Sequence, residues 1–340
     1  MILKRVFDLA VESDPLELVE MPIPAPAENE ILIKVSCCGV CHTELDEIEG
    51  RTAPPAYPIV PGHQVVGFVE RTGASAKRFQ PGERAGVAWI FSACGECDYC
   101  RKGLENLCTQ FRATGRDAHG GYAEYLTVPE KFAYSIPKVF SDVEAAPLLC
   151  AGAIGYRSLR LTGLTSGQTL GLTGFGASGH LVLKMAKHLF PESKILVFAR
   201  SLEERTFARS LGASWAGNME DTPPFKANAI IDTTPAWSPV VESLRLLESG
   251  GRLVINAIRK ETADQSALLK INYPDHLWME KEIKSVANIT ARDVEDFLAL
   301  AAAVPINPEI ETYPFEQANR ALLDLKHKHV KGAKVLVINQ

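Results

Sequence analysis

The stretch TLGLTGFGASGHLVLKMAKHLF, residues 169–190, decides the fold of the second half of the chain. A short apolar run typical of a buried strand leads into three glycines and then into apolar residues at helical spacing. Gly174, Gly176 and Gly179 form the pattern G-x-G-x-x-G, which permits a tight turn, close approach of a pyrophosphate and close packing of the helix on the sheet. This context predicts a phosphate-binding loop at a helix N-terminus, with a plain glycine-rich turn as the alternative.

The residues beyond this stretch continue the alternation of strands and helices. Apolar runs at 194–200, 229–234 and 251–257 indicate strands, and amphipathic patterns at 202–213 and 237–249 indicate helices. Such alternation is typical of βαβ units around a parallel sheet. The sequence therefore predicts a doubly wound α/β domain in this part of the chain.

The first 150 residues, approximately, show a β-rich pattern instead. Short alternating runs separated by Gly and Pro turns lie at 31–37, 65–73, 83–90 and 123–129. This pattern suits a partly closed barrel. A helical pattern at 291–304 and a β-run at 333–339 end the chain, so we expect it to leave the first domain, form the second and return.

Length and charge set limits on the class of protein. A chain of 340 residues predicts about two domains, and a net charge of −5 argues against nucleic-acid or anionic-membrane partners. The sequence has no apolar stretch near the ~20 residues of a membrane span, and its first residues do not look like a signal peptide. We therefore expect a cytoplasmic protein without a membrane partner.

Four cysteines, Cys94, Cys97, Cys100 and Cys108, lie within fifteen residues of one another. Cytosolic thiols stay reduced, so disulfides are not expected. C-x2-C pairs chelate zinc, and four thiolates leave no open coordination position. The spacing thus predicts a structural zinc in a lobe at 92–110, with unligated reduced cysteines as the alternative.

A second group, Cys41, His63 and Cys150, is spread too widely to form a local motif. Two cysteines and one histidine are a known ligand set for a catalytic zinc, which needs an open fourth position. On spacing alone, however, buried structural cysteines and a core histidine are the favoured interpretation.

The end of the second strand of the doubly wound domain bears on the cofactor. NAD enzymes carry an acid there for the ribose 2′-OH, but this chain has Ala199, Arg200 and Ser201. Arg200 and Ser201 suit a 2′-phosphate, so we expect NADP(H) to be preferred and NAD(H) to be accepted as well. Glu203 and Glu204 follow, and we expect them to face solvent on the helix.

Five motifs in a fixed order now carry a family resemblance. They are GVCHTEL at 39–45, PGHQVVG at 61–67, the four-cysteine lobe, CAGAIGYRSL at 150–159 and TGFGASGH at 173–180. The chain resembles the zinc-dependent alcohol dehydrogenases of the medium-chain dehydrogenase/reductase superfamily, and is most similar to the bacterial and archaeal branch near cinnamyl alcohol dehydrogenases. The resemblance covers essentially the whole chain. It implies a GroES-like catalytic domain at 1–152 and 289–340 and a Rossmann cofactor-binding domain at 153–288.

The resemblance also implies two zinc ions per chain. The catalytic zinc takes Cys41, His63 and Cys150, and the structural zinc takes the four cysteines of the lobe. Thr43 matches the hydroxyl that hydrogen-bonds the substrate oxygen and passes its proton outward. Asp46 stands at the outer end of this relay, where many members have histidine.

Four further residues match the cofactor or substrate positions of the family. His42 matches a residue that contacts the cofactor pyrophosphate, and Arg292 matches a basic residue that reaches the cofactor. Trp89 matches an aromatic residue of the substrate pocket, with Ile90 as its neighbour there. The simpler alternatives are a core aromatic for Trp89 and a solvated helix start for Arg292.

Two departures from the family pattern lie beside the expected catalytic zinc. Glu44 replaces the usual Asp after the threonine, and Gln64 replaces the usual Glu after the zinc-binding histidine. Groups of this kind orient ligands and tune the metal. Gln64 removes a negative charge, so we expect a more electrophilic zinc if Glu44 compensates only in part.

The function implied is reversible hydride transfer between a primary or secondary alcohol and NAD(P), giving an aldehyde or ketone. The expected partners are the small-molecule substrate and further copies of the chain in a homodimer or homotetramer. A reductase of conjugated enals on the same fold is one alternative, because Asp46 alters the relay. A non-catalytic zinc-scaffold protein is the other.

Overall fold

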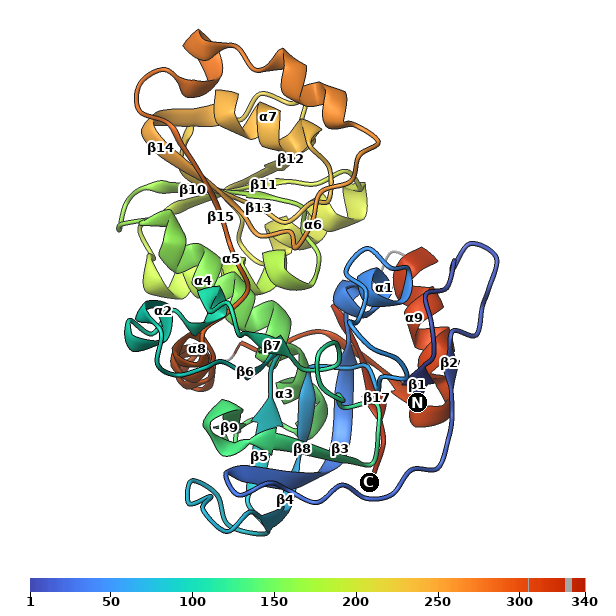
Figure 1. The fold of residues 1–340 in the computed structure, drawn as a ribbon. Helices are drawn as coiled ribbons and strands as arrows, with labels where there is room; N and C mark the ends of the chain where they lie inside the picture. The colour runs from blue at the N-terminus through green and yellow to red at the C-terminus, as the bar shows by residue number, and fades with distance from the viewer. Residues whose placement is uncertain (305, 328–331, 340) are drawn as a thin grey trace. The chain divides into compact units, whose positions relative to one another are not determined.

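The computed structural model describes residues 1–304, 306–327 and 332–339 (Figure 1). The chain forms two compact units. The first consists of Met1–Ala153 and Ile289–Gln340, and the second of Ile154–Asn288. The chain therefore leaves the first unit once and returns to it. No helix in the described ranges is long and apolar enough to cross a membrane.

The first unit is built on a seven-stranded sheet. Strands follow one another in the order β16-β17-β3-β4-β5-β9, and β8 pairs with β3. The central strand β3 is long enough to pair antiparallel with β4, β8 and β17. The strands are β3 (Glu30–Val40), β4 (Val65–Thr72), β5 (Arg84–Val87), β8 (Tyr125–Pro129), β9 (Ala133–Ser135), β16 (Ile310–Pro314) and β17 (Ala333–Val337).

Shorter elements surround this sheet and carry several of the predicted site residues. The small strands are β1 (Ile2–Leu3), β2 (Leu16–Glu17), β6 (Ile90–Ser92) and β7 (Arg112–Ala113). The helices are α1 (His42–Ile48), α2 (Asp98–Arg101), α3 (Asp142–Pro147), α8 (Ala291–Ala303) and α9 (Ala318–His327). A π-helical turn, Leu148–Gly152, follows α3. Such turns are rare and are frequent at functional sites, and this one contains Cys150.

The second unit contains a six-stranded parallel sheet in the order β12-β11-β10-β13-β14-β15. Its strands are β10 (Thr169–Thr173), β11 (Lys194–Phe198), β12 (Trp215–Gly217), β13 (Ala227–Asp232), β14 (Leu247–Ile255) and β15 (Glu282–Ser285). Its helices are α4 (Ala153–Thr162), which starts at the unit boundary, α5 (Ala177–Leu189), α6 (Leu202–Ser210) and α7 (Ser238–Leu246). When the six strands are numbered along the chain from β10, their order across the sheet is 3-2-1-4-5-6, which is the order of a dinucleotide-binding fold. The predicted α/β fold class is confirmed.

Strand β10 explains why the opening stretch shows a continuous apolar run. All five of its residues are buried because strands pair with it on both sides and helices cover the sheet. At Gly171 a Cβ atom would lie 2.9 Å from the Ile230 side chain of β13. A residue without a side chain therefore suits this central position.

The helix expected at 237–249 ends earlier than its pattern indicated. Helix α7 stops at Leu246, and strand β14 begins at Leu247, which pairs with Ala227 of β13. Leu246 and Leu247 are both buried, so an apolar pair fits a helix end and a strand start equally well. Pairing across the sheet, which helical periodicity does not reveal, decides the boundary.

Candidate active site and metal centres

Three elements of the first unit bring Cys41, His63 and Cys150 together. Cys41 is the residue before α1, His63 precedes β4, and Cys150 lies in the π-helical turn. Their ligand atoms all lie within 4.8 Å of one another. The two sulfurs are 3.9 Å apart, and His63 Nε2 is 3.2 Å from Cys150 Sγ. Tetrahedral zinc with Zn–S bonds of about 2.3 Å places sulfurs about 3.8 Å apart, so this cluster fits zinc and leaves a fourth position.

Glu44 holds the histidine of this cluster in place. One of its carboxylate oxygens is 2.6 Å from His63 Nδ1, and the other accepts the backbone N–H of Cys41 at 2.7 Å. Burial raises the pKa of Glu44, and attraction to His63 opposes that rise. The contact assigns the proton to Nδ1 and leaves Nε2 free to ligate, as in carboxylate–histidine–zinc arrangements. The glutamate that departs from the family pattern therefore orients the histidine of this cluster.

Gln64 lies beside the cluster, against the end of β3. Its backbone oxygen accepts the N–H of Gly39 at 2.9 Å. A Cβ atom at position 39 would lie 2.5 Å from Gln64 Oε1, so the amide side chain covers this glycine directly. Gln64 is buried and brings no charge to the site.

The residues expected in the proton relay lie on α1. Thr43 Oγ1 is 3.5 Å from Cys41 Sγ, which places the hydroxyl beside the metal ligands, and His42 is exposed. Asp46 is buried, and its Oδ1 accepts a hydrogen bond from Arg51 Nε at 2.6 Å. Arg51 also binds Glu49, so the outer relay position belongs to a charged network that the sequence did not reveal.

A third acid on α1, Glu47, was not recognised from the sequence as part of this region. It is 1% exposed, and among the described residues neither of its carboxylate oxygens has a hydrogen-bond partner. Burial, together with repulsion from Glu44, raises the pKa of Glu47 well above its usual range. Glu47 is therefore a buried carboxyl close to the cluster of Cys41 and His63, and its burial disfavours the charged form. The i,i+3 spacing of Glu44 and Glu47 places both acids on one face of the helix, but this spacing gave no sign that the face is buried.

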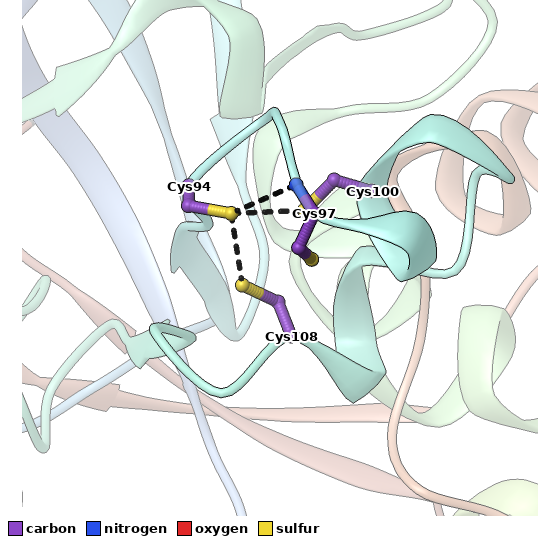
Figure 2. Close-up of side chains that lie close together, drawn as sticks. All are labelled: Cys94, Cys97, Cys100 and Cys108. Atoms are coloured by element: carbon purple, nitrogen blue, oxygen red, sulfur yellow. Dashed lines mark hydrogen bonds between the residues drawn. The ribbon is translucent and has the colours of Figure 1, made fainter.

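The four-cysteine lobe brings its thiols together in one cluster (Figure 2). Cys94 Sγ lies 3.8 Å from Cys100 Sγ and 3.5 Å from Cys108 Sγ. Backbone N–H groups of Glu96 and Cys97 lower the pKa of Cys94 to about 6, whereas burial raises that of Cys100 to about 12. All eight cysteines of the chain are free. The distances match the edges of a zinc tetrahedron, and a four-thiolate set suits a structural ion.

Glu105 connects this lobe to the start of α8. Its carboxylate accepts the backbone N–H of Ala291 at 2.6 Å. Arg292 follows on the exposed side of the helix start, with its side chain 80% exposed and a 3.4 Å contact to Asp296. In this structure the Arg292 side chain is solvated, whereas Thr290 and Asp293 at the same helix start are buried, and the cofactor role of Arg292 stays a prediction.

The two residues expected in the substrate pocket differ in burial. Trp89 is half-buried and lies against Phe111, with ring centroids 5.0 Å apart. Ile90 is 0% exposed and belongs to the core cluster of the first unit. No part of the Ile90 side chain is open to a substrate in this structure, because β6 turns it inward.

The glycine loop has the geometry that its three positions require. Gly174 has a φ of 80°, and a Cβ atom there would lie 2.6 Å from Thr233 Oγ1. Gly176 is the residue before α5, and a Cβ atom there would have nothing within 4 Å. At Gly179 a Cβ atom would lie 2.8 Å from the carbonyl oxygen of Gly174. The loop thus makes a left-handed turn, leaves one side open and packs its helix closely, which fits a pyrophosphate.

A buried ion pair lies beside this loop and was not visible in the sequence. The Asp232 carboxylate accepts Thr173 Oγ1 at 2.6 Å and Thr234 Oγ1 at 2.8 Å, and it pairs with Lys260. Lys260 Nζ also donates to the carbonyl oxygens of Thr234 and Ala236. The network links the chain segments that follow β10, β13 and β14, at the edge of the sheet where such folds bind ligands.

The end of β11 differs from expectation at one residue. Ser201 is the N-cap of α6, and its Oγ accepts the backbone N–H of Glu204 at 3.0 Å. The Glu204 carboxylate in turn lies 3.0 Å from Ser201 Oγ. The expectation that Glu204 faces solvent is therefore wrong, because a capping box turns it back toward the strand end. Arg200 is exposed, as a residue that contacts a cofactor requires.

Comparisons with known proteins place the chain in a family. Residues 27–138 match the family described as alcohol dehydrogenase GroES-like domain, and this domain joined to a Rossmann domain is the architecture of the oxidoreductase class to which the similar alcohol dehydrogenases belong. The chain is 42% identical over 333 residues to a probable alcohol dehydrogenase, AdhA, of Mycobacterium tuberculosis, covering 96% of the chain and 94% of that protein. An alcohol dehydrogenase of Geobacillus stearothermophilus is 31% identical, covering 96% of each.

A solved structure agrees with these relatives. A cinnamyl alcohol dehydrogenase from Sorghum bicolor matches with a TM-score of 0.80 and 26% identity, covering 93% of this chain and 92% of the other. The chain therefore belongs to the zinc-dependent alcohol dehydrogenases of the medium-chain dehydrogenase/reductase superfamily. The resemblance inferred from its motifs is confirmed.

Proposed function

We propose that this enzyme transfers hydride reversibly between a primary or secondary alcohol and NAD(P), with an aldehyde or ketone as the second product. The observation that carries the proposal is the cluster of Cys41, His63 and Cys150, oriented by Glu44, with three ligands and an open fourth position. The names of the relatives, alcohol dehydrogenase and cinnamyl alcohol dehydrogenase, support the substrate class. In this proposal the first unit holds the metal and the substrate, and the second holds the cofactor.

Zinc held by the cluster supplies a Lewis acid that polarises an alcohol oxygen and lowers its pKa, and nicotinamide supplies the hydride acceptor. Glu44 keeps the proton of His63 on Nδ1, so the ligand nitrogen stays available. Thr43 Oγ1, beside the ligand Cys41, accepts the hydroxyl proton of the substrate and passes its own proton outward. In this mechanism Asp46 receives the proton at the outer end of the relay, and Arg51 keeps its carboxylate in place.

Two zinc ions per chain belong to the same proposal. The four-cysteine lobe has no open position, so its ion organises the segment and takes no part in the chemistry. In the second unit, the backbone N–H groups at the start of α5 bind the cofactor phosphates in this proposal.

NADP(H) is the preferred cofactor in this proposal. No carboxylate stands at positions 199–201, and the Arg200 guanidinium offers a planar, charged fork to a 2′-phosphate. A charge-assisted contact of this kind is worth roughly 1.5–3 kcal/mol, or about tenfold to a hundredfold in affinity. Arg200→Ala should raise the KM for NADP(H) at least tenfold and leave that for NAD(H) nearly unchanged. An equal effect on both cofactors, or a wild-type preference for NAD(H), rejects the preference.

A substrate panel with both cofactors tests the reaction itself. We expect oxidation of alcohols and reduction of aldehydes or ketones by the zinc-loaded enzyme, and loss of both in Cys150→Ser. The alternative function, a reductase of conjugated enals, stays open because Asp46 is bound to Arg51 at the outer end of the relay. Cinnamaldehyde as substrate distinguishes this alternative from an alcohol dehydrogenase. NMR of the product distinguishes the allylic alcohol, which supports our proposal, from the saturated aldehyde, which contradicts it.

We further propose that the enzyme is a homodimer or homotetramer. Among the described residues β15 pairs only with β14, and all four of its residues are exposed. Trp278, Met279 and Ile283 are exposed apolar side chains on or next to this edge. An exposed apolar edge of this kind favours association of chains. Light scattering on wild type and Ile283→Lys tests the interface, and a monomeric wild type would contradict it. A cytoplasmic location stays a prediction.

A further inference from the structure

The chain segment that leaves β11 carries a carboxylate that the strand-end sequence does not show. Ser201 caps α6 by accepting the backbone N–H of Glu204 through its Oγ at 3.0 Å. The Glu204 carboxylate folds back and accepts from Ser201 Oγ at 3.0 Å and from the Ser201 backbone N–H at 3.4 Å. The hydroxyl proton of Ser201 is therefore directed to Glu204 and is not offered to a ligand.

Opposite charges meet at this strand end. Arg200 is exposed there, next to Ser201 in the chain. Arg205 also folds back from α6, and its Nη1 donates to the carbonyl oxygens of Ala199 at 3.2 Å and Arg200 at 3.3 Å. The Glu204 carboxylate thus lies within hydrogen-bond distance of Ser201, the residue after Arg200, while the Arg205 guanidinium binds the backbone of Ala199 and Arg200.

The two nicotinamide cofactors differ at the group that this segment meets in a dinucleotide-binding fold, the adenosine ribose 2′ position. A phosphate there carries about −1.5 to −2 charges at neutral pH and is repelled by a carboxylate. A 2′-hydroxyl is neutral and donates a hydrogen bond to the same carboxylate. The Glu204 charge therefore opposes one cofactor and accommodates the other.

We propose that Glu204 is a specificity-determining residue that limits the preference for NADP(H) and keeps NAD(H) usable. The inference rests on the proposed function, in which this strand end holds the ribose 2′ position. Arg200 attracts the 2′-phosphate, and Glu204 cancels part of that attraction while it occupies the Ser201 hydroxyl. The enzyme accordingly discriminates between NADP(H) and NAD(H) less strongly than it would with Arg200 and without the Glu204 charge.

Helix capping is the ordinary role of such a glutamate, and the chemistry of the box separates the two roles. Glutamine serves at the same position of a capping box as well as glutamate does. Glu204→Gln therefore keeps the cap of α6 and removes only the charge. Glu203 provides the matched control, because it is the preceding residue, it is exposed, and Glu203→Gln removes the same charge from outside the box.

The direct test measures binding to the zinc-loaded full chain by calorimetry. The probes are 2′,5′-ADP, which carries the 2′-phosphate, and 5′-ADP, which lacks it. We expect Glu204→Gln to tighten 2′,5′-ADP about threefold to tenfold, because a like charge near the phosphate is removed, and to change 5′-ADP less than about twofold. The ratio of kcat/KM for NADPH to that for NADH should rise by a similar factor. Glu203→Gln should leave the ratio of the two dissociation constants and the ratio of the two kcat/KM values within about twofold of wild type.

The inference is overturned if Glu204→Gln and Glu203→Gln give the same ratio of the two dissociation constants, or if Glu204→Gln shifts both probes equally. It is supported by a selective gain for 2′,5′-ADP, whichever cofactor the wild type prefers. A wild-type preference for NAD(H) with that selective gain rejects the cofactor preference proposed above and leaves the role of Glu204 standing. The two proposals therefore fail separately.

Discussion

Replacing Glu105 should loosen the four-cysteine lobe from the rest of its unit. Glu105 lies in the lobe, between Cys100 and Cys108, is 9% exposed, and accepts the backbone N–H of Ala291 at 2.6 Å. A hydrogen bond to a charged group contributes about 1.5–3 kcal/mol, and this one also places a negative charge at the N-terminus of α8. We expect Glu105→Ala to lower the free energy of unfolding by about 2–3 kcal/mol. Glu105→Gln keeps an acceptor oxygen without the charge and should cost about 1 kcal/mol.

Thermal unfolding of the zinc-loaded enzyme measures this effect. In a domain of this size 1 kcal/mol corresponds to roughly 2–4 °C in Tm, so the alanine variant should unfold about 4–12 °C lower and the glutamine variant about 2–4 °C lower. Zinc release from the lobe, followed with a chelating dye, should accelerate in the same order. Glu96→Ala, at an exposed position of the lobe, is the control. A Glu105→Ala variant that unfolds and loses zinc like the control would refute the reasoning.

Metal removal should distinguish the two cysteine sites, because a chelator is expected to take the metal of the open three-ligand cluster first. Activity should then be lost while the fold persists, and fewer than two zinc ions in fresh, active enzyme would contradict this prediction. Cys97→Ser should instead lower Tm, since the lobe loses one of its four ligands, and an unchanged Tm would argue against a structural ion. Burial lowers the pKa of His119, and the neutral Nδ1 of this histidine accepts the Val60 N–H at 3.1 Å. The stabilising contribution of neutral His119 is therefore complete above the ordinary histidine pKa of about 6.5, and it is lost as pH falls through the lowered pKa. His119→Asn keeps an acceptor that does not titrate and should flatten the fall of Tm between about pH 7 and 5; a pH dependence equal to that of wild type would exclude this role. Lys260→Met leaves the buried Asp232 carboxylate unpaired and should destabilise the second unit by about 3–5 kcal/mol in urea unfolding, whereas a loss below about 1 kcal/mol would show that the pair contributes little.

Features encoded over short distances follow from the amino-acid sequence alone. The three glycines lie within six residues, and their roles follow from one turn between a strand and a helix. The lobe cysteines are spaced for chelation in the same local way, because closing a short loop around an ion costs little entropy. The alternation of strands and helices likewise predicts the parallel sheet, since one face of each element must find a partner.

Contacts between distant segments needed the folded chain. Cys41 and Cys150 are 109 residues apart, and only the packing of α1 and the π-helical turn against the sheet of the first unit brings their sulfurs to 3.9 Å. From spacing alone the simpler interpretation of buried core residues was favoured, and the family resemblance, not the residues, reversed it. The link from Glu105 to Ala291 is equally invisible in the sequence, because it joins positions 186 residues apart.

The position and partners of particular side chains separate what the sequence determined from what only the tertiary structure decided. The sequence by itself determined that a strand, a helix start and two glutamates follow one another at the end of β11, because propensity and capping chemistry are local properties. It did not determine that Leu247 leaves helix α7 for the sheet, or that Asp232 meets Lys260 in the interior. Each of these depends on which surfaces the neighbouring segments cover. Burial decides whether a charge or an apolar group faces water, and only the tertiary structure sets burial.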